Sequence, residues 1–198
     1  MRENGPDSYK LVIDGYNMLA GCSTVLGWGD EVNDLDIHLG RLADVIADKS
    51  TRPIAFTDIS IHLGVSDPRR NPGRHASEQD RIRRWQHDSR VRVHARANRF
   101  DEVSGRYREK GVDTAITLDL CTSQASGRYA GVVLFSSDGD LAPALEHAYR
   151  APGASVQLAR WQDQRSGLWL PGVKLWCHYL DGHDLALCST RRGNRAAA

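Results

Sequence analysis

Residues 131–135 form an apolar run, Gly-Val-Val-Leu-Phe, that contains no polar side chain. Such a run is typical of a strand that is buried on both faces, as in a parallel sheet between two layers of helices. Shorter apolar segments predict further strands at 10–13, 53–56, 90–95, 155–159 and 174–178. Helical patterns separate them at 36–49, from 77 onward, at 112–121 and at 140–150. This alternation predicts an α/β domain with a mainly parallel sheet.

A chain of 198 residues is long enough for one domain with a substantial core, and short for two. There is no internal repeat and no clear linker. We expect a single domain over residues 8–180, in which residues 160–180 form an apolar C-terminal extension that packs on the rest. We expect residues 189–198 to be a flexible, basic tail.

The composition favours a soluble, cytoplasmic protein. The polar N-terminus lacks the apolar stretch of a signal peptide, and no apolar run approaches the roughly 18 residues of a membrane span. The four cysteines are scattered, without the paired spacing of a zinc site. A disulfide framework is not expected in a chain that can build its own core.

Positive charge is concentrated in the middle of the chain. The net charge is only +1, yet residues 69–110 hold 13 basic and six acidic side chains. Most of the basic residues are arginine, whose planar guanidinium suits bidentate contacts with phosphate. A solvated helix face with a bias toward arginine is the ordinary alternative, but the concentration as a whole favours a nucleic-acid partner.

Aspartates follow two of the predicted strands and open one of the predicted helices. Asp14 follows the first strand, Asp138 and Asp140 follow the apolar run, and Asp113 stands at a helix start. In a parallel α/β sheet, ligands bind beyond the carboxyl ends of the strands. Asp113 and Asp140 alone would be more simply explained as helix caps, and the Asp-Gly pairs as tight turns. Their coincidence at one edge of the sheet is what favours a site.

Four carboxylates that converge repel one another and raise one another's pKa values. A hard divalent cation relieves this repulsion, and Mg²⁺ prefers carboxylate oxygen together with water. The pattern therefore predicts a metal site.

Three motifs in this order resemble the NYN domain family of PIN-like nucleases. They are Val-Ile-Asp-Gly-Tyr-Asn-Met at 12–18, Glu-Lys-Gly-Val-Asp at 109–113 followed by Leu118-Asp119, and Leu-Phe-Ser-Ser-Asp-Gly-Asp-Leu at 134–141. The resemblance covers residues 10–159. It implies a PIN-like three-layer α/β/α fold with a mainly parallel sheet of about five strands, and a ribonuclease activity that depends on Mg²⁺ or Mn²⁺. It departs from the family at Leu141, where an aromatic residue is common.

The resemblance also implies which residues act. The catalytic group would be Asp14, Asn17, Asp113, Asp138 and Asp140, with the four aspartates as metal ligands. Asp119 matches a frequently acidic position and is a further candidate. We expect RNA to be held by Lys110, Arg69, Arg70, Arg96, Arg99, Arg106 and Arg108, and Tyr16 or Tyr107 to stack on an unpaired base or to pack in the protein. For the tryptophans after residue 160, core packing is the favoured interpretation.

Two other functions stay open from the sequence. One is a catalytically silent module of the same fold that binds RNA or protein; retention of all four aspartates argues against it. The other is a phosphatase with an aspartate nucleophile, although Tyr16 stands where a second acid is expected. No phosphate-binding Gly-rich loop and no His-Glu-x-x-His zinc motif is present. RNA class, DNA as substrate, endonuclease or exonuclease action and homodimer formation are left undecided.

Overall fold

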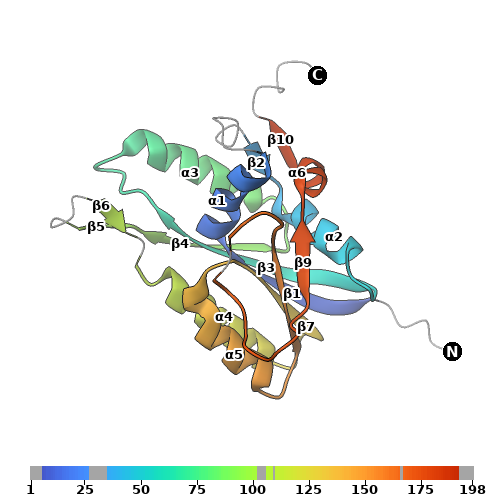
Figure 1. The fold of residues 1–198 in the computed structure, drawn as a ribbon. Helices are drawn as coiled ribbons and strands as arrows, with labels where there is room; N and C mark the ends of the chain where they lie inside the picture. Colours follow the sequence, from blue (N-terminus) through green and yellow to red (C-terminus); the bar gives the residue numbers. More distant parts are fainter. Residues whose placement is uncertain (1–5, 27–34, 102–105, 109, 166, 192–198) are drawn as a thin grey trace.

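The computed structural model of the protein describes residues 6–26, 35–101, 106–108, 110–165 and 167–191 (Figure 1). Its centre is a six-stranded sheet in the order β4-β3-β1-β7-β8-β9, and every neighbouring pair is parallel. The strands are β1 (Asp7–Asp14), β3 (Ile54–Val65), β4 (Val91–Ala97), β7 (Gly131–Phe135), β8 (Ser155–Trp161) and β9 (Cys177–Leu180). The fold class is confirmed, but the sheet has six strands where the resemblance implied about five.

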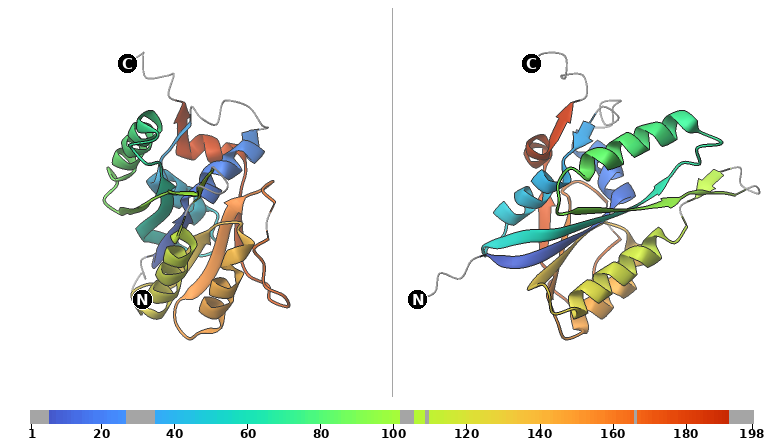
Figure 2. Two further views of the ribbon diagram at one scale, coloured as in Figure 1. Left: turned by 90° about the vertical axis from the view of Figure 1, so that its left-hand side faces the viewer. Right: turned by 180° about the vertical axis from the view of Figure 1, so that it is seen from behind.

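Helices cover both faces of this sheet, as Figures 1 and 2 show. One face is covered by α1 (Gly15–Leu26), α2 (Leu39–Asp48), α3 (Pro72–Trp85) and α6 (Gly182–Cys188), and the other by α4 (Val112–Ala125) and α5 (Ala142–Arg150). Each layer has its own apolar core. Because successive strand residues point to opposite faces, Leu11 and Ile13 enter the first core and Val12 enters the second. None of the helices described could cross a membrane.

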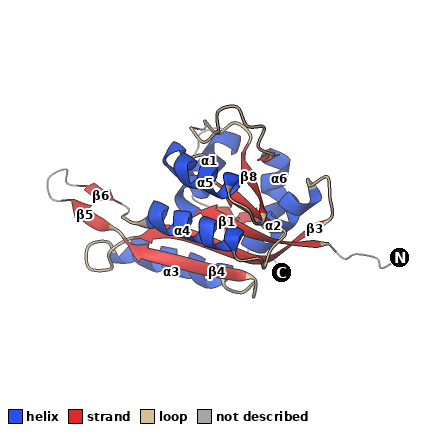
Figure 3. Ribbon diagram, turned by 90° about the horizontal axis from the view of Figure 1, so that it is seen from below, coloured by secondary structure: helices blue, strands red, loops and turns tan. Residues whose placement is uncertain are grey.

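Two short antiparallel pairs lie outside the main sheet. Strand β2 (Leu35–Ile37) pairs with β10 (Ser189–Arg191), and β5 (Arg99–Asp101) pairs with β6 (Arg106–Arg108). The β5–β6 pair forms an arm that projects from the body of the molecule beyond β4 (Figure 3). Residues 189–191, expected in a flexible tail, are therefore a strand, because β2 offers them backbone partners. Residues 192–198 of that predicted tail lie outside the described residues.

Strand order reverses at β1. The chain passes from β1 outward to β3 and β4 on one side, then returns to β7, β8 and β9 on the other. β1 and β7 therefore flank the point where the strand order reverses, and in open α/β sheets ligands bind beyond the carboxyl ends of the strands at this point. This reversal decides where the candidate site lies.

The chain differs from the sequence-based expectation in three helices. Helix α1 begins at Gly15, where a turn was expected, and α6 was not predicted. Helix α3 begins at Pro72, before the predicted start at residue 77, because Asn71 caps it by accepting a hydrogen bond from the Arg74 N–H. Proline is favoured in this first turn, since its missing N–H would have no partner there.

The segment after residue 160 packs on the domain only in part. Trp161 is fully buried against Phe135, and Leu168 and Leu170 enter the second core. Trp169 and Trp176 are exposed, so the favoured interpretation of the tryptophans as core residues is wrong for these two.

Gly15 lies where α1 makes its closest approach to β3. A Cβ added to it would stand 2.8 Å from the His62 carbonyl oxygen and 2.9 Å from Leu63 Cβ. We expect Gly15→Ala to lower the free energy of unfolding by about 1–3 kcal/mol, because backbone must move to admit the methyl group.

Urea unfolding followed by circular dichroism measures this change. Gly73→Ala in α3 is the matched control, since nothing lies within 4 Å of its added Cβ. Alanine there should stabilise the helix by about 0.5–1 kcal/mol. Equal stability of Gly15→Ala and wild type would contradict the packing argument.

Candidate active site

Asp14 is the last residue of β1, and its side chain lies on the sheet face that α4 covers. It is buried, with 5% of its surface exposed. One carboxylate oxygen accepts a hydrogen bond from the Asn17 N–H at 3.0 Å, as a helix-capping side chain does, and the other accepts from the Ser136 hydroxyl at 2.9 Å. The carboxylate is therefore held rigidly from β1 and from the end of β7.

Residues 136–140 form a tight loop after β7 that presents two further carboxylates. The Ser136 hydroxyl oxygen accepts from the Asp138 N–H at 3.1 Å, and Asp138 Oδ1 accepts from the Asp140 N–H at 3.0 Å. The 3₁₀ turn η2 (Gly139–Leu141) follows and leads into α5. This loop places Asp138 half-buried and Asp140 exposed beside the end of β1.

Asn17 connects the same loop to the segment after β8. Its side-chain oxygen accepts from the Ser137 N–H at 3.0 Å and from the Gln164 amide at 2.6 Å. Gln164 also donates to the Asn17 carbonyl at 3.1 Å, and the Gly167 N–H donates to the Ser137 carbonyl at 3.1 Å. Asn17 therefore ties the loop after β7 to the segment after β8.

Asp113 reaches this group from the first turn of α4. The left-handed Gly111, with φ of 79°, caps that helix, and Asp113 is exposed in its first turn. The alternative that Asp113 and Asp140 are simple helix caps is wrong, because neither side chain makes a capping hydrogen bond in the described part of the chain.

The aspartates are close enough to alter one another's ionisation. Burial raises the pKa of Asp14 from 3.8 to about 6; the hydrogen bonds from Asn17 and Ser136 oppose this, and the charges of Asp138 and Asp113 add to it. Burial also raises the pKa of Asp113, with further contributions from Asp138 and Asp140. The charges of Asp113 and Asp138 thus act on Asp14, and those of Asp138 and Asp140 act on Asp113, beside the carboxyl ends of β1 and β7. We call Asp14, Asp113, Asp138 and Asp140 the aspartate cluster.

The basic residues expected to hold RNA lie on several elements: before α4, in the loop between β3 and α3, on β4 and on the arm. Lys110 is exposed immediately before α4, and Arg69 and Arg70 are exposed in the loop between β3 and α3. Arg96 is exposed on β4 and Arg99 on β5; the Arg70 guanidinium lies 4.2 Å from the centre of the Phe100 ring. Arg106, Tyr107 and Arg108 belong to β6, and their side chains lie outside the described residues.

Asp119 is not part of the aspartate cluster. It points from α4 onto β1 and β3, where its carboxylate lies 2.5 Å from Lys10 Nζ and accepts hydrogen bonds from Ser60, His62 and Ser123. Burial raises its pKa, but the hydrogen bonds from His62, Lys10 and Ser60 outweigh burial and lower the pKa overall. The carboxylate is thus ionised and can only accept, so His62 Nε2 carries the proton in this contact.

Around Asp119 lies the one group of described residues in which three potential ligand atoms come within 4.8 Å of one another: His62, His94 and Asp119. The two imidazole rings are stacked, with centres 4.6 Å apart and planes at 10°. A cation bound here would compete with the Lys10 ammonium for the same carboxylate. The group is a candidate metal site by distance, but its charge is already balanced by Lys10.

Two residues of the site carry no signal that would single them out in the sequence. Ser136 belongs to the third motif but was given no role, and Gln164 lies beyond all three motifs. Both act through hydrogen bonds that form only when the ends of β1, β7 and β8 meet.

Comparison with known proteins agrees with this architecture. The family model described as the NYN domain matches residues 10–166. A crystal structure of a protein of unknown function from Vibrio parahaemolyticus superposes with a TM-score of 0.59 and 15% sequence identity, covering 93% of this chain and 99% of that chain. At this identity, the similarity shows the fold alone. No curated protein matches the chain.

The raised pKa of Asp14 predicts how metal-free stability depends on pH. The folded protein keeps a proton on Asp14 up to a pH of about 6, whereas the unfolded chain releases it near 3.8, so stability falls as the pH rises through this window. We expect Asp14→Asn, in EDTA, to be about 1–3 kcal/mol more stable than wild type at pH 8, and this advantage to vanish near pH 4.

Chemical denaturation at a series of pH values provides the measurement. Asp48→Asn is the control, because Asp48 is an exposed aspartate at the end of α2, away from the aspartate cluster. At pH 8 the free energy of unfolding of Asp48→Asn should differ from that of wild type by less than that of Asp14→Asn does. An Asp14→Asn curve parallel to that of wild type would refute the pKa assignment.

The Lys10–Asp119 ion pair lies outside the aspartate cluster and predicts an effect on the free energy of unfolding. Asp119→Ala should lower the free energy of unfolding by about 3–5 kcal/mol, because it leaves the buried Lys10 ammonium without its partner. Replacing both residues with apolar ones, Lys10→Met with Asp119→Leu, should recover only part of the loss, because Ser60, His62 and Ser123 still lose their acceptor. The midpoints of urea unfolding measure these changes. An unchanged midpoint for Asp119→Ala would show that the Lys10–Asp119 pair contributes little to stability.

Proposed function

Because the chain belongs to the NYN domain family, we propose that it is a metal-dependent ribonuclease that hydrolyses RNA phosphodiester bonds at the aspartate cluster. One observation carries the proposal: a buried carboxylate, Asp14, is held beside two others whose charges raise its pKa further. Such an arrangement costs stability, so a protein that keeps it has a use for concentrated negative charge. We further propose that the protein acts on RNA in the cytoplasm.

The donor set fits a hard divalent cation. The aspartate cluster offers carboxylate oxygens from β1, α4 and the loop after β7, which are the ligands that Mg²⁺ and Mn²⁺ prefer. These carboxylates repel one another, and their oxygens do not come within 4.8 Å of one another as a group in the described structure. A bound ion supplies Lewis-acid stabilisation of the phosphate charge and a water of lowered pKa.

The chain's own residues would position the reacting groups. The hydrogen bonds from Asn17 and Ser136 leave Asp14 a single orientation, which is the preorganisation that a site for charge stabilisation requires. The Asn17 side-chain oxygen is occupied by Ser137 and Gln164, and its amide nitrogen has no hydrogen-bond partner among the described residues. That nitrogen is a donor available to a water or to a phosphate oxygen.

Affinity for RNA would come from the basic residues at the same edge of the sheet. Lys110 lies three residues before Asp113 in the sequence, and Arg96 of β4 and Arg99 of β5 are exposed. Contacts of this kind neutralise phosphates without reading bases, and they weaken as the salt concentration rises.

Cleavage of a labelled single-stranded RNA in Mn²⁺ tests the proposal. We expect wild type to cut, and Asp14→Asn and Asp138→Asn to lose about 100-fold or more in rate, because each removes one charge from the aspartate cluster. Asparagine retains the oxygen that accepts from Asn17 or Asp140, so both variants should fold. Asp48→Asn, outside the site, should cut like wild type.

EDTA should abolish cleavage, and Mn²⁺ should raise the melting temperature of wild type but not of Asp14→Asn, since a ligand that binds the folded state stabilises it. Cleavage at the same rate by wild type and both site variants would identify a contaminating nuclease and end the proposal. No cleavage and no thermal shift with metal would favour the silent binding module.

A further inference from the structure

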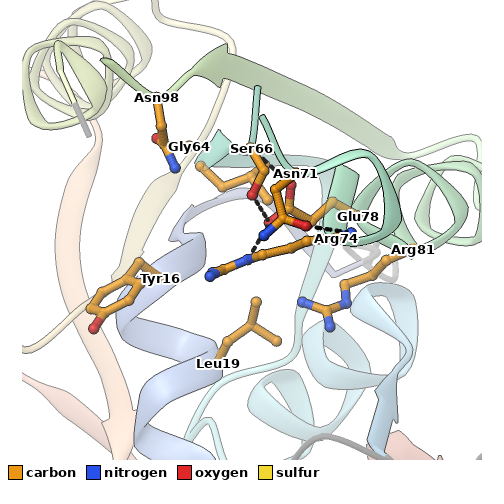
Figure 4. Close-up of a pocket in the computed structure, with 10 residues that line it drawn as sticks. Tyr16, Leu19, Gly64, Ser66, Asn71, Arg74, Glu78, Arg81 and Asn98 are labelled. Carbon is orange, nitrogen blue, oxygen red and sulfur yellow. Dashed lines mark hydrogen bonds and ion pairs between the residues drawn. The ribbon is translucent and has the colours of Figure 1, made fainter. Parts of the chain in front are cut away.

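A pocket opens at the carboxyl edge of the sheet, on the face opposite to the one on which Asp14 lies. It has a volume of about 230 Å³ and lies between the start of α1, the end of β3 and the start of α3 (Figure 4). Its lining includes Tyr16, Asn71, Arg74, Glu78, Arg81 and Asn98. We call it the Tyr16 pocket. None of these residues takes part in the mechanism above.

An exposed aromatic ring forms one wall of the Tyr16 pocket. Tyr16 lies in the first turn of α1, and 66% of its surface is exposed, the largest fraction among the large apolar and aromatic side chains described as exposed. A ring this exposed contributes little to the core. An aromatic face at a pocket is instead suited to stacking on a flat, apolar group such as a base.

Guanidinium groups stand across the pocket from this ring (Figure 4). Arg74 Nε donates to Glu78 Oε1 at 3.0 Å, and Glu78 is itself fixed by the Ser66 N–H and hydroxyl. Among the described residues, the terminal nitrogens of Arg74 have no further partner. Arg74 is therefore anchored at one nitrogen and open at the others, and with Arg81 it outweighs the charge of Glu78. A phosphate is the anion that such a planar donor fits best.

Carboxamides complete the lining. The Asn71 oxygen is used to cap α3, and its amide nitrogen is left to donate. Asn98 follows β4, and its side-chain oxygen is buried without a hydrogen-bond partner in the described part of the chain. Amide groups of this kind hydrogen-bond the edges of bases.

The position of the pocket links it to the aspartate cluster. Tyr16 is two residues after Asp14, yet Asp14 faces α4 whereas the Tyr16 pocket faces α3. A strand that crosses the edge of the sheet at the end of β1 would therefore meet the pocket on one side and the aspartate cluster on the other.

We propose that the Tyr16 pocket binds one nucleotide of the substrate strand, with the base against the Tyr16 ring and the phosphate at Arg74. This inference rests on the proposed ribonuclease function and adds to it a subsite that holds a base next to the cleaved bond. A base that enters the pocket cannot remain paired and stacked in a helix. The subsite therefore requires an unpaired nucleotide at that position.

Binding measured in EDTA tests the subsite separately from hydrolysis. The probe is a fluorescent single-stranded RNA of about eight nucleotides, followed by anisotropy. We expect Tyr16→Ala to raise the Kd about tenfold, within the range measured for loss of one stacked base, and Tyr16→Phe to stay within about twofold of wild type. Arg74→Ala should also weaken binding and should reduce its dependence on salt.

Tyr149→Ala is the matched control. Tyr149 is an exposed tyrosine in the last turn of α5, and α5 runs from the carboxyl edge of the sheet to the opposite edge. The Kd of Tyr149→Ala for the single-stranded RNA should equal that of wild type. A blunt duplex of the same sequence should bind wild type and Tyr16→Ala alike, because its bases cannot enter the pocket.

Three results would overturn the proposal. They are wild-type affinity of Tyr16→Ala for the single strand, an equal loss in Tyr149→Ala, and an equal loss for the duplex. A free mononucleotide that binds as tightly as the strand, with the same dependence on Tyr16, would assign the pocket to free nucleotides and overturn the strand assignment. If binding depends on Tyr16 but no metal-dependent cleavage occurs, the ribonuclease proposal is wrong. The assignment of the Tyr16 pocket as a nucleotide-binding site would then still hold.

Discussion

The carboxylate of Asp14 is the point on which the rest of the site depends. It ends β1, caps the start of α1 through the Asn17 N–H and accepts the Ser136 hydroxyl from the end of β7. The first helix, the central strand and the loop that bears Asp138 and Asp140 are therefore held by one side chain. Burial and the nearby charges make its ionised form costly, and only fixed hydrogen bonds offset that cost.

The order of the strands explains why this carboxylate has charged neighbours. β1 and β7 flank the point where the strand order reverses, and α4 begins at the same edge with Asp113 in its first turn. On the other face, the same edge carries the Tyr16 pocket between α1 and α3. One edge of the sheet thus presents negative charge on one side and an aromatic ring with guanidinium groups on the other.

The polar network around Asp119 differs from the surroundings of Asp14 in how the buried charge is balanced. Asp119 lies on the same face as Asp14, but Lys10, Ser60, His62 and Ser123 satisfy it, and its pKa falls where that of Asp14 rises. The charge of Asp119 is already balanced within the fold, whereas Asp14 lies beside other carboxylates, and we propose that a cation balances its charge. This contrast separates two aspartates that the resemblance had placed together.

The sequence by itself determined the α/β class, the strand at 131–135 and the three acidic motifs, because apolar periodicity and short-range turn chemistry are local properties. Only the tertiary structure decided that the strand predicted at 174–178 pairs with β8 at the edge of the sheet. It alone decided that Asp119 pairs with Lys10 instead of joining the cluster, and that Ser136 and Gln164 support the site. Each of these depends on contacts between residues that are far apart in the chain. Such contacts leave no local pattern, since they follow from strand order and from the direction in which each side chain leaves its strand or helix.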